Sequence, residues 1–536
     1  MNLLNHAIPY RLEGVKVADI IILTGKLAYK EANRQASILR EKGYNASVGL
    51  VNVDVAVFMN ERIVANWVNE RCNSVRGSII VIPGGARVDP GRLMDMIACR
   101  GIKLVRGPLH ISDLSLYMDA LELDKWNLDK PVDQIVNIEK RTLVDRVYSS
   151  LILGVDGIKS MHSGITIPVR PPPFLPVAEV YTDSRLGLML YERKIKLLTD
   201  KKYPIAVVGS VNNDANNLKK GVQLLEKEGF NGIIGIDANL SRKVLDLVKS
   251  SSVEILLSLD GRRLRVLEER WGKRFPKDTT IVLTPSNPHS KPSGKIRSLK
   301  QGFRKAVNLG LERVIIDPIL PPPVIGSHRI VDIAKIVESL TPLGAPIMLG
   351  LSNYVELVDA DSPGVVFTLI QLSVEAGASL GLFSEESVKT QGVFMEAFKA
   401  AKMISYSVHT RKTPKDLGLS LLLLKSKKWS HPILEISEVE VLAPSTETGP
   451  IGEWDPSGSY NVILDQYKEL IYIKKTSQRR WIAATNWRTL TDYIIRNDAP
   501  TVGHAFYLGK ELYKAELALR LGKDYIQDRP LFNDEN

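Results

Sequence analysis

Polar side chains end most of the apolar runs in the middle of this sequence, and these are the residues that could do chemistry. Runs rich in Ile, Leu and Val recur between residues 177 and 386, and nearly every one stops at Asp, Asn, Ser or Glu. In chain order these polar residues are Asn212 and Asn213, Asp237 and Asn239, Asp260, Asn287, Asp317, Ser352 and Asn353, and Glu385. If the runs are parallel strands of one closed barrel, their carboxyl ends meet at a single mouth, where the active sites of such barrels lie.

A ring of Asp and Asn at the mouth of an apolar tube favours a flat, polar ligand. An Asp carboxylate accepts two hydrogen bonds from an amino-pyrimidinone edge, and an Asn carboxamide both donates and accepts. A planar ligand inside the barrel needs a partner for each edge atom, because a buried polar group without one is costly. A pterin ring has such an edge. A sugar phosphate would instead need a Gly-rich loop after the seventh or eighth strand, and the segments GLSN and LFSEE do not clearly supply one.

Each of these residues also has a structural interpretation. Asp and Asn after a strand are common helix N-caps and turn residues, so a single position does not establish a ligand group. Asp317 differs from the others because it precedes Pro318. A residue before proline is held extended, which makes Asp317 a poor helix cap and a better fixed ligand group.

Eight strand-like runs, each followed by a segment of helical periodicity, predict a TIM (β/α)8 barrel over residues 175–410. The runs are Val177–Asp183, Tyr203–Asn213, Gly232–Ala238, Glu254–Asp260, Thr279–Asn287, Arg313–Ile319, Pro346–Asn353 and Ser379–Glu386. An open doubly wound sheet would also alternate strands and helices, but usually with fewer units.

Smaller domains are predicted on both sides of the barrel, and the fold class is α/β. Residues 1–125 alternate apolar and amphipathic segments, which predicts a small doubly wound α/β domain with a parallel sheet. Residues 126–174 form a predicted connector with a helical part. A second connector, residues 411–450, is followed by a small α+β domain at residues 451–536, where a hairpin pattern precedes two helical patterns.

Several of the strand ends resemble those of the pterin-binding barrel superfamily, which holds dihydropteroate synthases and methyltetrahydrofolate–corrinoid methyltransferases. Ile315–Pro323 (IIDPILPPP) resembles the strand-six Asp-Pro motif, and Ala345–Leu357 (APIMLGLSNYVEL) resembles the strand-seven motif. Leu256–Gly261 and Gly229–Asn239 resemble earlier strand ends that finish in Asp. Asp455–Pro530 resembles an uncharacterised domain that accompanies pterin and methyl-transfer proteins in archaea. The chain as a whole resembles the archaeal dihydropteroate synthase-related proteins.

The resemblance implies roles for the matching positions. Asp317 would accept hydrogen bonds from the pterin edge, Asp237 would be a second acceptor, and Asp260 would lie at the mouth. Asn353 would bind the pterin near its reactive nitrogen and is the candidate catalytic residue. The remaining candidates for pterin binding are Asn287, Gly350 and Ser352. The implied cofactor is a reduced pterin of the tetrahydromethanopterin or tetrahydrofolate type.

Two departures from dihydropteroate synthases bear on the reaction. Those enzymes carry Ser-Arg-Lys after the strand-seven Gly-Leu and an Arg-X-His pair on strand eight. Here Ser352 is followed by Asn353 and Tyr354, and the strand-eight run ends in Glu385 and Glu386. A pyrophosphate leaving group needs fixed cations, so its displacement is disfavoured unless Lys291, Lys295 or Lys389 takes their place.

Methyl transfer makes different demands, because a tertiary amine leaves poorly until its nitrogen is protonated or strongly hydrogen-bonded. The acceptor would be a separate molecule, such as a corrinoid protein or a thiol. The first loop of the N-terminal domain, LTGKLAYKEANRQ, lacks the Asp-X-His-X-X-Gly pattern that supplies a lower cobalt ligand, so bound cobalamin is not predicted. The leading hypothesis is a pterin-dependent transferase of one-carbon metabolism that moves a methyl group. The alternatives are dihydropteroate synthase-like condensation and a pterin-binding module without catalysis.

Composition excludes several other classes of function. The net charge of +11 comes from basic residues that are interleaved with acids, without an Arg/Lys tract, which argues against nucleic-acid binding. The two cysteines are too few for a disulfide framework or a four-ligand metal site, so we predict no metal and a reducing, cytoplasmic setting. No apolar run approaches the ~20 residues of a membrane span. A homodimer is left open, since nothing in the sequence identifies its surface.

Overall fold

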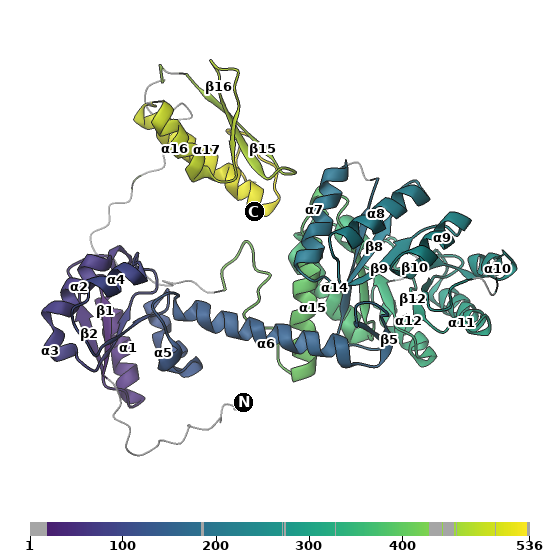
Figure 1. Ribbon diagram of the computed structural model, residues 1–536, viewed down its shortest axis with the longest axis horizontal. Coiled ribbons are helices and arrows are strands. Elements are labelled where there is room, and N and C mark those ends of the chain that lie inside the picture. Colours follow the sequence, from purple (N-terminus) through teal and green to yellow (C-terminus); the bar gives the residue numbers. More distant parts are fainter. Residues whose placement is uncertain are drawn as a thin grey trace. The chain divides into compact units, whose positions relative to one another are not determined.

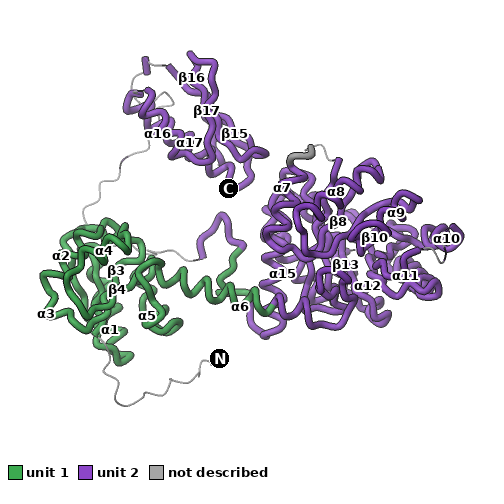
Figure 2. Tube along the Cα trace, viewed as in Figure 1, with its two compact units in different colours: residues 1–147, 414–420 green, residues 148–413, 421–536 purple. Residues whose placement is uncertain are grey.

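The computed structural model contains two compact units, shown in Figure 2. The first comprises residues 1–147 and 414–420, and the second comprises residues 148–413 and 421–536. The structure describes residues 19–183, 187–270, 272, 275–326, 329–427, 442, 455–456, 458–498 and 500–532. Most of the predicted second connector, residues 428–441 and 443–450, therefore lies outside the described residues.

The first unit is built on a parallel sheet of four strands in the order β2-β1-β3-β4. Its strands are β1 (Ile20–Thr24), β2 (Ala46–Leu50), β3 (Ile79–Ile82) and β4 (Lys103–Arg106). Its helices are α1 (Tyr29–Glu41), α2 (Glu61–Glu70), α3 (Cys72–Val75), α4 (Pro90–Met96) and α5 (Leu114–Ala120), with short 3-10 turns at Ala56–Phe58, Ile111–Asp113 and Leu123–Lys125. Two separate hydrophobic clusters cover the two faces of the sheet, one with α2 and α4 and one with α1 and α5. This is the doubly wound arrangement that the sequence predicts.

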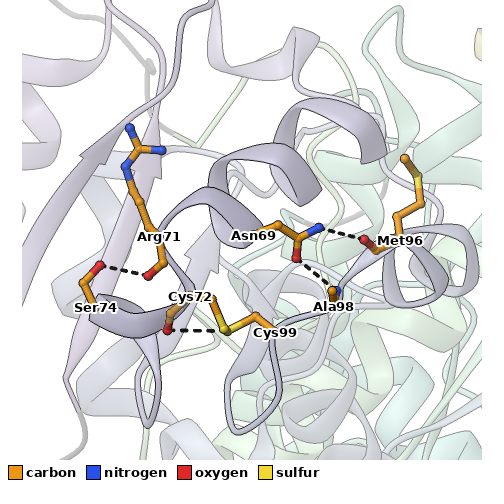
Figure 3. The surroundings of a disulfide bond; sticks show 7 residues. All are labelled: Asn69, Arg71, Cys72, Ser74, Met96, Ala98 and Cys99. Atoms are coloured by element: carbon orange, nitrogen blue, oxygen red, sulfur yellow. Dashed lines mark hydrogen bonds between the residues drawn. A yellow bond between two sulfur atoms is a disulfide. The ribbon is translucent and has the colours of Figure 1, made fainter.

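A single disulfide joins Cys72, the first residue of α3, to Cys99, which lies between α4 and β4 (Figure 3). The two Cα atoms are 5.3 Å apart. Beside the disulfide, the Asn69 side chain donates to the carbonyl of Met96 and accepts from the amide of Ala98, at 2.9 Å each. This pairing differs from the reducing setting that the sequence analysis predicts, because two isolated cysteines do not form a recognisable disulfide framework in the sequence.

Helix α6 (Val132–Gly154) leads to the second unit, where eight parallel strands form the predicted TIM barrel (Figure 1). They are β7 (Leu175–Tyr181), β8 (Ile205–Gly209), β9 (Ile233–Asp237), β10 (Val253–Leu259), β11 (Thr280–Leu283), β12 (Val314–Ile316), β13 (Met348–Gly350) and β14 (Leu380–Ser384). They follow one another around the sheet, β14 pairs with β7, and a bridge between Ile316 and Ile347 closes the ring. The α/β barrel fold is therefore confirmed, and each predicted run contains one strand.

Helices surround the barrel, as Figure 1 shows. They are α7 (Gly187–Asp200), α8 (Ala215–Lys227), α9 (Arg242–Ser250), α10 (Gly261–Arg270), α11 (Pro292–Asn308), α12 (Asp332–Leu340), α14 (Ser362–Ala376) and α15 (Val393–Thr410). A short extra helix, α13 (Ser352–Glu356), follows β13, and 3-10 turns lie at Thr341–Leu343 and Val388–Thr390. The strands are mostly apolar on both faces because one face packs on these helices and the other fills the barrel, and the side chains of both faces belong to one hydrophobic cluster.

A hairpin of β5 (Gly157–Lys159) and β6 (Thr166–Pro168) covers the amino end of the barrel. Glu254, the second residue of β10, is buried there and accepts from the Ser160 hydroxyl and the Met161 amide, both at 2.7 Å. The Arg313 guanidinium donates to the carbonyl of Lys159 at 2.8 Å. These polar groups hold the hairpin against the amino ends of β10 and β12.

The C-terminal part has the predicted α+β composition. An antiparallel sheet of β15 (Tyr460–Asp465), β16 (Leu470–Lys475) and β17 (Ile482–Ala484) packs on α16 (Trp487–Asn497) and α17 (Val502–Leu521). Two acidic residues of the last helix are enclosed in this packing. Glu511 and Glu516 are buried, because Tyr525 and Lys514 pair with the first and the Trp487 amide and Arg520 pair with the second. Within the described residues, no helix is long and apolar enough to cross a membrane.

Candidate functional site

Asp317 lies directly after β12 in a turn that its own carboxylate shapes. Its Oδ1 accepts from the Ile319 amide at 2.7 Å, and its own amide donates to the Leu283 carbonyl on β11 at 2.9 Å. The Lys295 ammonium donates to the Ile319 carbonyl at 2.5 Å and is itself fully buried. Burial raises the pKa of Asp317 to about 6, although the Ile319 amide and the Lys295 charge oppose that rise. The pKa of Lys295 is lowered to about 8, mainly by burial.

Asp237 is the last residue of β9, and a distortion of the next strand supplies its partner. Ser258 of β10 has a φ of +64°, a left-handed conformation that is uncommon for a residue with a side chain. Its side chain hydrogen-bonds to Asp237. The Arg263 guanidinium donates to the Ser258 carbonyl and, at 2.6 Å, to Oδ1 of Asn239. Burial raises the pKa of Asp237, while Ser258 and the Arg263 charge act to lower it.

Glu179, in the middle of β7, is an acidic residue of this site that the sequence analysis did not single out. Its side chain is only 7% exposed and hydrogen-bonds to that of Tyr181, two residues further along the strand. Burial, together with the charges of Asp237, Glu386 and Asp317, raises the pKa of Glu179 to about 8, and the hydrogen bond with Tyr181 opposes that rise. The structure thus brings acidic groups from β7, β9 and the end of β12 within electrostatic reach of one another, all in the carboxyl half of the barrel.

Two predicted ligand residues use their side chains in local turns. Asp260 follows β10, and its Oδ1 accepts from the amides of Arg262 and Arg263 at 2.9 and 2.8 Å, which caps α10. Asn287 follows β11, and its Oδ1 accepts from the His289 amide at 3.0 Å. In both cases the side chain acts as a helix cap or turn residue, which is the structural interpretation given above for Asp and Asn after strands.

The strand-seven motif contributes Gly350, Ser352 and Asn353 to the region after β13. Gly350 ends β13, and a Cβ atom placed on it would meet nothing within 4 Å. The Ser352 hydroxyl donates to the Leu382 carbonyl at 3.3 Å. Asn353, the second residue of α13, is exposed.

One lysine near the strand-eight glutamates is already paired with an acid. The Lys194 ammonium donates to the Glu385 carbonyl at 2.5 Å and lies 3.5 Å from the Glu386 carboxylate. The Glu385 carboxylate accepts from the Phe394 amide at 2.9 Å, and burial raises its pKa to about 7.

The three lysines considered as replacements for missing cations lie in different environments. Lys389 pairs with Asp359 at 3.1 Å, and Lys291 is exposed at the N-cap of α11. Lys295 alone of these three is buried beside a site carboxylate. Across the described residues, no group of three or more His, Cys, Asp or Glu side chains could hold a metal ion.

Comparisons with known proteins agree with the motifs. Residues 454–528 match the family model PterinBD-DUF4346. An uncharacterized protein of Methanocaldococcus jannaschii is 25% identical over 542 aligned residues, which cover 96% of this chain and 99% of that protein.

Solved structures similar to the barrel include two dihydropteroate synthase chains. The Xanthomonas albilineans dihydropteroate synthase is 13% identical, covers 47% of this chain and 98% of its own, and has a TM-score of 0.35. The HPPK-DHPS protein of Plasmodium falciparum is 12% identical, with 60% and 64% coverage and a TM-score of 0.36. A truncated 3-deoxy-D-arabino-heptulosonate 7-phosphate synthase from Thermotoga maritima is 13% identical, with 46% and 88% coverage and a TM-score of 0.32. The C-terminal family match and the end-to-end similarity to the Methanocaldococcus jannaschii protein support the resemblance to pterin-binding proteins that the sequence motifs indicate.

Proposed function

We propose that the barrel binds a reduced pterin at its carboxyl end and transfers a methyl group from the pterin to a second molecule. The observation that carries this proposal is the convergence of Asp237 and Asp317, which lie far apart in the chain and are coupled electrostatically inside the barrel. Buried carboxylates of this kind need hydrogen-bond donors. The amino and ring N–H groups along a pterin edge are such donors, and the open space at Gly350 offers room for the ring.

The balance of charge supports methyl transfer over condensation. Expulsion of pyrophosphate needs several fixed cations, whereas the residues that converge here are mostly acidic and Lys194 is engaged by Glu386. Asn353, at the start of α13, is the proposed neutral hydrogen-bond donor near the reactive nitrogen. The pterin is of the tetrahydromethanopterin or tetrahydrofolate type, and the acceptor is a thiol or a corrinoid protein.

Condensation of the dihydropteroate synthase type is the second candidate, and Lys295 is the observation that favours it. A buried ammonium beside Asp317 is a fixed positive charge at the mouth. Titration of the purified full-length chain with an N5-methyl tetrahydropterin and with a pterin pyrophosphate separates the two. Saturable binding of the methylated compound alone supports methyl transfer, and preference for the pyrophosphate would support condensation.

Replacement of Asp317 by Ala is expected to weaken binding of the methylated pterin by ~1–3 kcal/mol, or about 5- to 150-fold, because the pterin edge loses a buried acceptor. Calorimetric titration at pH 7 measures the change. Asp246→Ala, which removes an exposed carboxylate on α9, is the matched control and should bind like the parent protein. Equal affinity in the Asp317 variant would place the ligand elsewhere.

Replacement of Lys295 by Met should move the acid limit of binding to higher pH. Loss of the neighbouring cation raises the pKa of Asp317 above about 6, so its carboxylate is protonated, and lost as an acceptor, at a less acidic pH. We expect the midpoint of the affinity loss between pH 8 and pH 5 to rise by about one pH unit or more. Lys305→Met removes a cation from the same helix, one that pairs with Glu268 instead, and should leave the midpoint unchanged. An unshifted midpoint in the Lys295 variant would show that this lysine does not govern the site carboxylate.

A further inference from the structure

Glu179 has an environment that differs from that of the two aspartates. It is buried and lies level with Val207 of β8 and with Ser384, the last residue of β14, two residues before β7 ends. The charged side chains that face it are acidic: Asp237 from β9, Asp317 from the end of β12, and Glu386 from the end of β14. The cations of the region act on those neighbours instead. Arg263 acts on Asp237, Lys295 on Asp317, and Lys194 on Glu386.

Tyr181 holds the Glu179 carboxyl from the same strand and is itself fixed by a glycine. A Cβ atom on Gly209 of β8 would lie 2.8 Å from the Tyr181 ring, so the ring lies against a position that only glycine can occupy without displacing it. Tyr181 is partly exposed, whereas Glu179 is buried. The pair therefore combines a carboxyl shielded from water with a phenol that is partly exposed to it.

A proton donor is what the proposed methyl transfer requires, and the aspartates do not meet that need. They serve as acceptors for the pterin edge in their ionised forms. An amine nitrogen that loses its methyl group must gain a proton at the same time, because the nitrogen anion that would otherwise form is a poor leaving group. A buried carboxyl surrounded by other acids keeps its proton at neutral pH and gives it up to a bound base.

We infer that Glu179, held by Tyr181, is the general acid that protonates the pterin nitrogen as its methyl group departs; this inference rests on the proposed function. With a thiolate as the acceptor, a sulfur–carbon bond forms while the carbon–nitrogen bond breaks. The electron pair of the broken bond stays on the nitrogen and takes the Glu179 proton. The products are a thioether, a pterin with an N–H group and a Glu179 carboxylate, which regains its proton from water.

The affinity of the full-length protein for an N5-methyl tetrahydropterin, measured between pH 6 and pH 9.5, tests this role. If the protonated carboxyl donates to the ligand, affinity falls once Glu179 ionises, at a pH of about 8, and continues to fall about tenfold per pH unit above that. In Glu179→Gln the amide still donates but does not titrate, so affinity should stay level across this range. Glu228→Gln, an exposed change at the end of α8, should keep the parental profile.

Methyl transfer to a small thiol gives a second measurement on the same variants. At saturating pterin, we expect kcat in Glu179→Gln to fall ~100-fold or more while Kd at pH 7 changes little, because the amide cannot give up a proton. A pH-independent affinity in the parent protein, or equal kcat in both proteins, would overturn the role of Glu179 while leaving pterin binding intact. Binding without any transfer by the parent would overturn the thiolate step. No binding at any pH would overturn the proposed function itself.

Discussion

Glu179→Gln is expected to make the loss of unfolding free energy between pH 4.5 and pH 8 about 3–5 kcal/mol smaller than it is in the unmodified protein. The pKa of Glu179 is raised from 4.5 to about 8 in the folded chain, mainly by burial. Between these two pH values the folded state keeps the proton and the unfolded state does not. Stability from this group is therefore complete below about pH 4.5 and disappears as pH rises through about 8.

The full-length chain is unfolded in urea at a series of pH values. Hydrogen exchange in peptides from β7 to β9 reports the unfolding of the barrel at each pH. The glutamine variant should be more stable than the parent at pH 8, with an advantage that shrinks toward pH 4.5. Asp317 and Glu385 remain in both proteins and cause their own losses of stability as the pH rises toward about 6 and about 7, so the difference between the two proteins isolates Glu179. Glu228→Gln, on the exposed end of α8, should reproduce the parental slope. Identical slopes in the parent and in Glu179→Gln would mean that Glu179 is not buried as described.

Removal of the disulfide is expected to lower the stability of the first unit by about 3 kcal/mol, since the bond closes a long loop in the unfolded chain. Cys72 and Cys99 are 27 residues apart in the sequence, which sets the size of that loop. The double variant with Cys72→Ser and Cys99→Ser should open the four-stranded sheet more readily. Faster hydrogen exchange in β1 and β3 measures this change.

The barrel strands provide the internal control for this experiment because they belong to the other compact unit. Their exchange should not change. A reducing agent should destabilise the parent protein as far as the double variant and should not affect the double variant at all. If the reductant leaves the parent unchanged, the cysteines of the protein in solution are not joined.

The barrel could be predicted from the sequence because each strand is apolar on both faces and therefore stands out from the amphipathic helices. Asp237 and Asp317 could be predicted for a related reason, since a polar residue at the end of such a strand interrupts a strong pattern. Glu179 was missed because it lies inside the run VAEVY. Val177, Glu179 and Tyr181 share one face of the strand, because side chains two residues apart point to the same side. The position of Glu179 on that face was the available signal.

Other features depend on contacts that one sequence cannot specify. Lys295 was considered only as a loop cation, yet it lies in the first turn of α11, where the helix directs it inward to the Ile319 carbonyl. The buried Glu511 looked like a surface residue because its partner Tyr525 follows the end of α17. The pairing of Cys72 with Cys99 depends on where α3 and the segment after α4 come together in space.

The hairpin that covers the amino end of the barrel bears on how reactants reach the proposed site. Glu254 and Arg313 hold this hairpin through hydrogen bonds, so we expect both reactants of the proposed transfer to enter at the carboxyl end of the strands. A compound that occupies that end should then compete with the pterin and with the methyl acceptor alike.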